Sequence, residues 1–106
     1  MKKITVLGPN PAMQKTLFFE RFNYGNISRA KSMEVFPAGK GINFCRAGRC
    51  LGQSEYELIE FTGGENGAYV ERELAKEGMT CRNIRTVNPT RCCITCLCQS
   101  SGTMSE

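Results

Sequence analysis

The sequence predicts an α/β fold, because short apolar strands alternate with segments of helical periodicity. Residues 56–61 (YELIEF) read as a strand. Residues 68–77 read as an amphipathic helix, with Val70 and Leu74 four positions apart. Residues 81–87 read as a second strand. A strand, a helix and a strand joined by short loops form a βαβ unit with parallel strands.

The first half of the chain contains further strands and another helix. Strands are expected over residues 3–7, 16–22 and 30–36. Gly8-Pro9-Asn10-Pro11 ends the first of them, because its two prolines oppose both a helix and a central strand. A turn is expected at residues 24–26 and a helix over residues 42–51. Gly52 and Gly78 are placed to end the two helices.

The last third of the chain ends in an unfinished pattern. A strand is expected over residues 91–98, after a break at residues 88–90, and Ser100-Ser101-Gly102 reads as a hairpin turn. The sequence stops at Glu106, where the partner strand of that hairpin would begin. Parallel sheets are normally covered by helices on both faces, and only two helices are expected here. We therefore interpret residues 1–106 as a single partial domain with a bare face or edge.

The composition fits a globular domain that binds a small anion. Hydrophobic residues make up 41% and charged residues 23%, which excludes the low-hydrophobicity signature of disorder. The net charge is +4, but the 14 Lys and Arg residues are scattered, whereas nucleic-acid binding needs a clustered basic face. Only four apolar residues follow Lys2-Lys3, too few for a signal peptide, and no window approaches the roughly 18 apolar residues of a membrane span. We expect a cytoplasmic protein with no nucleic-acid or membrane partner.

Seven cysteines are the unusual count in this composition. Cys93-x-x-Cys96 resembles half of a zinc or redox motif, but the sequence has no second such pair and no histidine. Residues 91–98 (RCCITCLC) also alternate like a strand, where cysteine behaves as a small hydrophobe. Reduced structural thiols are the favoured interpretation, and a metal or redox module over residues 92–98 stays open.

Gly39-Lys40-Gly41, just before the first expected helix, invites three interpretations. A P-loop needs G-x-x-x-x-G-K-[ST], but Gly41 follows the lysine. A dinucleotide fingerprint needs G-x-G-x-x-G, and its third glycine position is Phe44. What remains is a flexible helix cap or a ligand loop. Glycines let the backbone approach a ligand, a helix start offers free N–H groups, and Lys40 and Asn43 add a charge and an amide, which suits a hydroxylated, anionic small molecule.

Four groups of residues form a series of landmarks along the chain. They are Asn10-Pro11-Ala12-Met13-Gln14-Lys15-Thr16, then Gly39-Lys40-Gly41-Ile42-Asn43 running on through Arg46-Ala47 to Leu51-Gly52, then Gly63-Gly64-Glu65-Asn66-Gly67, then Thr90-Arg91. In this order and spacing they resemble the PfkB carbohydrate kinases over essentially all 106 residues, with the 1-phosphofructokinase and tagatose-6-phosphate kinase branch most similar. The resemblance implies the N-terminal part of a ribokinase-like three-layer α/β sandwich with β-lid strands. It also implies ATP-dependent phosphorylation of fructose 1-phosphate, fructose 6-phosphate or tagatose 6-phosphate.

The resemblance assigns roles in binding the substrate. The backbone at Gly39 and Gly41 and the side chain of Asn43 would hold sugar hydroxyls. Arg91 would clamp the existing phosphate of the substrate through two hydrogen bonds. The full set of implied substrate-binding residues is Gln14, Arg29, Gly39, Lys40, Gly41, Asn43 and Arg91, with Lys40 and Arg29 the weaker candidates for the phosphate. ATP and Mg would be the cofactors, held by segments of the family that this sequence does not include, and no residue here is assigned a catalytic or metal-binding role.

The chain also departs from the family pattern. Gln14 stands where the family usually has an aspartate that binds sugar hydroxyls, and a lost charged hydrogen bond costs about 1.5–3 kcal/mol, or roughly tenfold to a hundredfold in affinity. Cys45 and Gly48 are milder changes in the first helix, and Glu60 stands where the family is apolar or glycine. The family's G-A-G-D segment, which carries the catalytic aspartate, does not occur in the sequence. The sequence therefore leaves open whether this chain is an enzyme, and we expect no kinase activity from it alone.

Two other functions stay open beside that of an inactive kinase part. The first is a non-catalytic sugar-phosphate-binding or regulatory subunit, which would pair with a full-length kinase or form a homodimer through lid strands. The second is the Cys-rich metal or redox module over residues 92–98.

Overall fold

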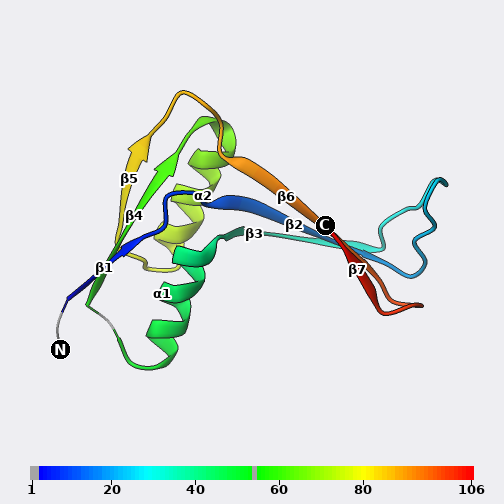
Figure 1. Ribbon diagram of the computed structural model, residues 1–106, viewed down its shortest axis with the longest axis horizontal. Helices are drawn as coiled ribbons and strands as arrows, with labels where there is room; N and C mark the ends of the chain where they lie inside the picture. Colours follow the sequence, from blue (N-terminus) through cyan, green and yellow to red (C-terminus); the bar gives the residue numbers. More distant parts are fainter. Residues whose placement is uncertain (1–2, 54) are drawn as a thin grey trace.

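A computed structural model describes residues 3–53 and 55–106. In chain order the elements are β1 (Ile4–Leu7), β2 (Ala12–Phe19), β3 (Ser32–Ala38), α1 (Lys40–Cys50), β4 (Tyr56–Thr62), α2 (Gly64–Lys76), β5 (Cys81–Arg85), β6 (Arg91–Cys98) and β7 (Thr103–Ser105). The strands form two sheets, one in the order β1-β4-β5 and the other in the order β3-β2-β6-β7 (Figure 1).

The three-stranded sheet is parallel throughout, as the predicted βαβ unit requires. β4 pairs with β1 on one side and with β5 on the other, and α2 connects β4 to β5. Alternate residues of β4 are buried beneath both helices, where Leu58 packs with Ile42 of α1 and with Val70 and Leu74 of α2. Each such side chain contributes about 1.5–3 kcal/mol when fully buried. In the described part of the chain this cluster is the hydrophobic core of the α/β unit, and it lies on the helix-covered face of the three-stranded sheet.

The four-stranded sheet extends away from that core (Figure 1). β2 pairs antiparallel with β3 and parallel with β6, and the short β7 pairs with the last three residues of β6. Pro37 lies in β3, which is an edge strand where a missing N–H is tolerated. The chain measures 50 × 34 × 19 Å and its radius of gyration is 16.0 Å, against about 13 Å for a compact domain of this length. The lid strands therefore project from the α/β unit.

Several helix and strand boundaries in the structure differ from the predicted ones. The second strand begins at Ala12 rather than at residue 16, and the third covers Ser32–Ala38 rather than residues 30–36. The second helix begins at Gly64 rather than at residue 68, since Gly67 N–H already donates to Gly63 O at 2.9 Å. The strand predicted over residues 81–87 ends at Arg85, and it pairs parallel with β4 as expected for the second strand of the βαβ unit.

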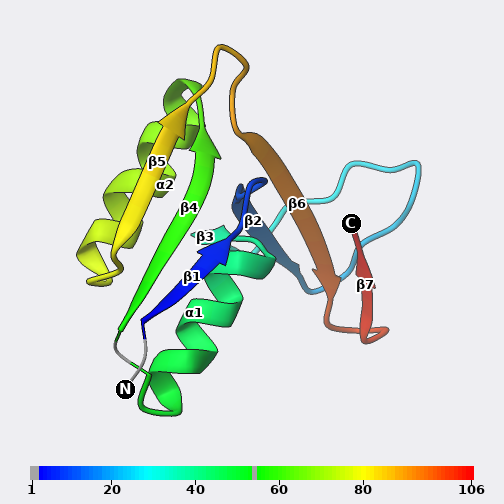
Figure 2. The same ribbon diagram turned by 60° about the vertical axis from the view of Figure 1, so that its left-hand side comes forward.

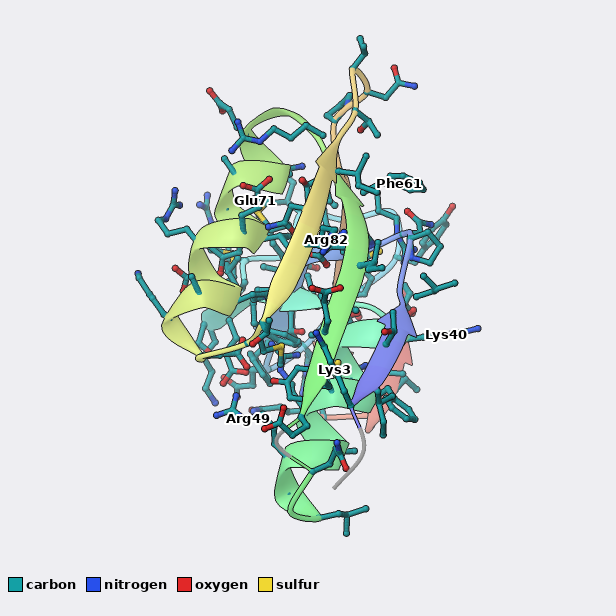
Figure 3. The ribbon with its side chains drawn as sticks, turned by 90° about the vertical axis from the view of Figure 1, so that its left-hand side faces the viewer. Lys3, Lys40, Arg49, Phe61, Glu71 and Arg82 are labelled. Atoms are coloured by element: carbon teal, nitrogen blue, oxygen red, sulfur yellow. The ribbon has the colours of Figure 1, made fainter. Side chains whose placement is uncertain are left out.

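The second face of the three-stranded sheet has no helix on it within the described residues. Figure 3 looks onto this face, and the ring of Phe61 projects there from β4. Leu7 is 74% exposed, and Phe61 and Ile84 are each 45% exposed. Apolar patches of this kind on a sheet favour association with another surface. In the described parts of the chain, no helix is long and apolar enough to cross a bilayer.

We expect residues 1–106 to self-associate through this face. Sedimentation velocity at increasing concentration should show species larger than a monomer, and the double variant Leu7→Lys/Phe61→Lys should shift the distribution to the monomer because it places two charges on the patch. Tyr24→Lys is the matched control, because Tyr24 is a large apolar side chain that is 98% exposed in the β2–β3 loop, away from the sheet. A monodisperse wild-type monomer at all concentrations would contradict this prediction.

Candidate functional site

A cleft opens where the two sheets meet. The chain crosses from one sheet to the other between β1 and β2 and again between β5 and β6 (Figure 2). The cleft has a volume of about 450 Å³, within the range of small-molecule sites. Its lining residues are Leu7, Gly8, Pro9, Asn10, Pro11, Gly39, Lys40, Gly41, Ile42 and Arg91. It lies beyond the carboxyl end of β1, the end of parallel strands where α/β proteins bind their ligands.

Glycines shape the floor of this cleft. Gly39 precedes α1 with φ at 143°, a backbone conformation that favours glycine. Gly41 packs directly on the backbone after β1, and a Cβ on Gly41 would come within 2.7 Å of Gly8 Cα and 3.1 Å of Leu58 Cδ1. A larger residue at position 41 would push the helix off the sheet. Glycine is therefore required at position 41 by packing and favoured at position 39 by the backbone conformation.

The start of α1 supplies donors for an anion. The helix begins at Lys40, and no side chain among the described residues caps it. The N–H groups of its first turn are therefore available, and the helix dipole favours negative charge at this end. Lys40 is exposed at the rim. The described lining residues include the two cations Lys40 and Arg91 and no carboxylate, so the cleft is positively charged.

Arg91 is held in place by its own strand and by the neighbouring loop. It is the first residue of β6, pairs with Ala12 of β2, and donates from Nη2 to Asn10 O at 3.1 Å. The preceding Thr90 is buried. Its N–H donates to Gly63 O at 2.9 Å, and its hydroxyl oxygen accepts a hydrogen bond from Gly63 N–H at 3.0 Å. Asn66 Nδ2 donates to Thr90 O at 3.0 Å. The glycine-rich start of α2 thus fixes the point from which Arg91 projects.

Arg46 fixes the other wall of the cleft, a role that the sequence analysis did not assign to it. Its Nη1 donates to Pro37 O at 2.9 Å, while Nε and Nη2 donate to Glu77 Oε1 and Oε2 at 2.9 and 2.7 Å. Hydrogen bonds from Arg46 lower the pKa of Glu77. This fork ties the end of β3, just before Gly39, to the end of α2. The only sequence signal was its place among the landmark residues.

The structure separates the remaining predicted residues from the cleft wall. Gln14 donates from Nε2 to Thr95 Oγ1 at 2.7 Å, in the middle of the lid sheet. Asn43 is exposed on α1, and its Oδ1 accepts from Arg46 Nη1 at 3.4 Å. Arg29 is exposed in the β2–β3 loop, at the far end of a ladder that runs roughly 20 Å from the cleft at about 3.3 Å per residue. The cleft is lined by four of the predicted residues, Gly39, Lys40, Gly41 and Arg91. It is not lined by Gln14, Asn43 or Arg29.

The cysteines show no paired arrangement in the described part of the chain. All seven thiols are free. Cys93 and Cys96 lie three positions apart on β6, so they point to opposite faces and cannot both bind one ion. Cys98 accepts from Phe22 N–H at 3.4 Å and lies 3.4 Å from Ser100 Oγ. Hydrogen bonds, above all from Ser100, lower the pKa of Cys98 to about 6.

The described residues do not fit an ATP–magnesium site. Among them, no group of three Cys, Asp or Glu side chains is arranged to hold a metal ion. Mg²⁺ in nucleotide sites is held by carboxylates together with the phosphates, and the lining residues of the cleft that the structure describes include none.

Comparison with known proteins identifies the fold. The chain superposes on phosphofructokinase-2 from Escherichia coli in complex with fructose-6-phosphate with a TM-score of 0.91 and 25% identity, covering 99% of this chain and 34% of that one. A possible 1-phosphofructokinase from Thermotoga maritima gives 0.84 and 26% identity, with 98% and 34% covered. Ribokinase from Thermotoga maritima gives 0.78 and 23% identity, with 99% and 35% covered, which shows the fold alone. The fold is that of the N-terminal third of ribokinase-like kinases.

Comparison at the level of sequence identifies the family. No curated protein sequence matches the chain significantly. The chain spans about a third of the length of the solved structures that it resembles. The sequence pattern described as pfkB family carbohydrate kinase matches residues 1–105, almost the whole of this chain. The chain therefore belongs to the pfkB family of carbohydrate kinases.

Proposed function

We propose that this chain is the sugar-phosphate-binding part of a cytoplasmic kinase that phosphorylates fructose 1-phosphate, fructose 6-phosphate or tagatose 6-phosphate. The observation that carries the proposal is the cleft, in which the uncapped start of α1, Lys40 and Arg91 surround a space of about 450 Å³. A relative with the same fold was solved in complex with fructose-6-phosphate. ATP and magnesium would be bound by parts of the family fold beyond residues 1–106.

Each group in the cleft has a role in this proposal. The N–H groups at Lys40 and Gly41 and the guanidinium of Arg91 bind the phosphate of the substrate, because helix starts and Arg both suit that anion. Asn43 and Gln14 reach the sugar hydroxyls only after side-chain movement, since Gln14 now donates to Thr95 and Asn43 faces Arg46. Arg29 is too distant from the cleft to bind a ligand held there by the same chain.

Nuclear magnetic resonance of ¹⁵N-labelled residues 1–106 tests the site. Addition of fructose 6-phosphate should shift the backbone amide signals of Lys40, Gly41 and Ile42 and the side-chain signal of Arg91. Fructose at the same concentration should shift them much less, because it lacks the phosphate. If the fructose 6-phosphate shifts fall elsewhere, for example on the β2–β3 loop near Arg29, the cleft is not the site.

A non-catalytic binding subunit is the second candidate function. The uncovered face of the three-stranded sheet favours it, since Leu7, Phe61 and Ile84 would be covered by a partner chain. In this case the cleft would keep its affinity for a sugar phosphate, and residues 1–106 would co-purify with a full-length kinase of the family in a fixed ratio. Pairing without any ligand-induced shift in the cleft would favour a purely structural partner.

A further inference from the structure

Among the residues that the structure describes, three buried side-chain oxygen atoms have no hydrogen-bond donor. Glu60 is 1% exposed, and neither of its carboxylate oxygens has a partner among the described residues. Asn83 Oδ1 is likewise buried and without a partner in the described parts of the chain. Buried polar atoms in native proteins are nearly always satisfied, so each exception needs an explanation. The sugar-phosphate cleft uses none of these atoms.

Glu60 and Asn83 are neighbours across the sheet. β4 and β5 are parallel, and their register places Glu60 directly beside Asn83. Side chains at such paired positions leave the same face of the sheet, on strands about 4.8 Å apart. The unpartnered oxygens therefore belong to side chains on the same face of adjacent strands, and one hydrogen on the carboxyl group of Glu60 would allow a hydrogen bond between the two groups. A carboxylic acid in its neutral form has that hydrogen to donate.

The groups around Glu60 oppose its negative charge. From α2, Glu71 faces it, and both Glu71 oxygens already accept hydrogen bonds, from Thr62 Oγ1 at 2.6 Å and Arg85 Nη2 at 3.2 Å. From α1 and β5, the thiols of Cys45 and Cys81 face it.

On the remaining side β1 ends at Leu7 and is followed by Gly8, which has no side chain to donate. Burial first, and then the charge of Glu71, raise the pKa of Glu60 to about 7. Glu71 itself keeps its charge, because the hydrogen bond from Thr62 lowers its pKa.

We propose that Glu60 is a protonated carboxylic acid in the folded chain, that its hydroxyl donates to Asn83 Oδ1, and that loss of this proton loosens the packing of α2 on β4. The pair acts as a pH-sensitive latch in the core, independent of ligand binding in the cleft. An ionised Glu60 would be a buried charge without a partner, which strongly disfavours the folded state.

The direction of the pH dependence follows from proton linkage. A carboxyl with a raised pKa in the folded state binds more protons there than in the unfolded chain, so it stabilises the fold fully below pH 4.5. That contribution is lost as pH rises toward and through pH 7. The equilibrium constant for unfolding should therefore rise roughly fiftyfold to a hundredfold between pH 5 and pH 8 through this group. The sequence contains no histidine to obscure the change.

Cys98 must be replaced in the variants that are compared, because its pKa is lowered to about 6. Its ionisation therefore stabilises the fold as pH rises, which is opposite to the effect of Glu60. Urea unfolding at pH 5 and pH 8 should be compared between Cys98→Ser and Cys98→Ser/Glu60→Gln. For Cys98→Ser, the equilibrium constant for unfolding should rise roughly fiftyfold to a hundredfold from pH 5 to pH 8. That of Cys98→Ser/Glu60→Gln should not, since glutamine keeps a donor for Asn83 at every pH. Cys98→Ser/Glu57→Gln is the control, because Glu57 lies on the other face of β4 and should leave the loss unchanged.

Infrared spectroscopy gives a second reading that does not depend on a cooperative transition. The C=O band of a protonated carboxylic acid should be present at pH 6 in Cys98→Ser and absent when Glu60 is also replaced by glutamine. Equal stability of Cys98→Ser at pH 5 and pH 8, or greater stability at pH 8, overturns the proposal. That result would mean that Glu60 is ionised and accepts from the amide nitrogen of Asn83 instead.

Discussion

Residues 1–106 alone should release no ADP from ATP above a buffer control when fructose 1-phosphate, fructose 6-phosphate or tagatose 6-phosphate is added. The same residues joined after Glu106 to the remaining two thirds of phosphofructokinase-2 from Escherichia coli should phosphorylate at least one of these sugars. Phosphoryl transfer depends on positioning and on charges around the transferred group. The described residues offer neither a magnesium ligand set nor the aspartate of G-A-G-D.

The comparison needs two controls. The C-terminal part of the Escherichia coli enzyme alone should be inactive if the sugar phosphate binds in the proposed cleft, because that part lacks the cleft. A hybrid with Gly41→Val should be folded poorly or inactive, since a side chain at this position meets Gly8 Cα. Turnover by residues 1–106 without any added part, lost on Arg91→Ala, would show that this chain carries a catalytic site of its own.

Local patterns were sufficient for several elements of the fold. The strand over Arg91–Cys98 was predicted with its observed bounds, because alternation and the break at Pro89 are both local features. Both helix stops were also predicted, and Gly52 and Gly78 have φ at 90° and 77°. The loop Gly39-Lys40-Gly41 was correctly predicted to lie at the start of a helix, because this signal is also local in the sequence.

Features that depend on distant partners were not predictable. The second strand begins at Ala12, because pairing with both β3 and β6 extends it to the residue after Pro11. Arg29 was named as a weaker candidate for the phosphate, and the structure places it in the loop beyond the β2–β3 ladder, because the strand pairing sets how far the hairpin extends from the cleft. Glu60 was noticed as a departure from the family pattern. Only the register of β4 on β5 showed that Asn83 lies beside it.

Arg91→Ala should weaken binding of fructose 6-phosphate by the hybrid kinase roughly tenfold to a hundredfold, while binding of fructose should change less than about threefold. The guanidinium lies at the cleft and donates to Asn10 O, so its removal takes away a charged partner of the phosphate in the proposed site. Such a hydrogen bond contributes about 1.5–3 kcal/mol, which corresponds to that change in affinity.

Isothermal titration of the hybrid with both ligands measures this difference, and Arg72→Ala is the matched control. It also removes one exposed arginine and lowers the net charge equally, but from α2 and outside the lining of the cleft, so the affinity for fructose 6-phosphate should stay near the wild-type value. Arg91→Lys should recover part of the affinity, because an ammonium keeps the charge but not the fork geometry. Gln14→Asp should act in the other direction and tighten both ligands, since a carboxylate accepts charge-assisted hydrogen bonds from sugar hydroxyls. If Arg91→Ala weakens fructose and fructose 6-phosphate equally, Arg91 serves only to hold the loop at Asn10, and the phosphate lies elsewhere.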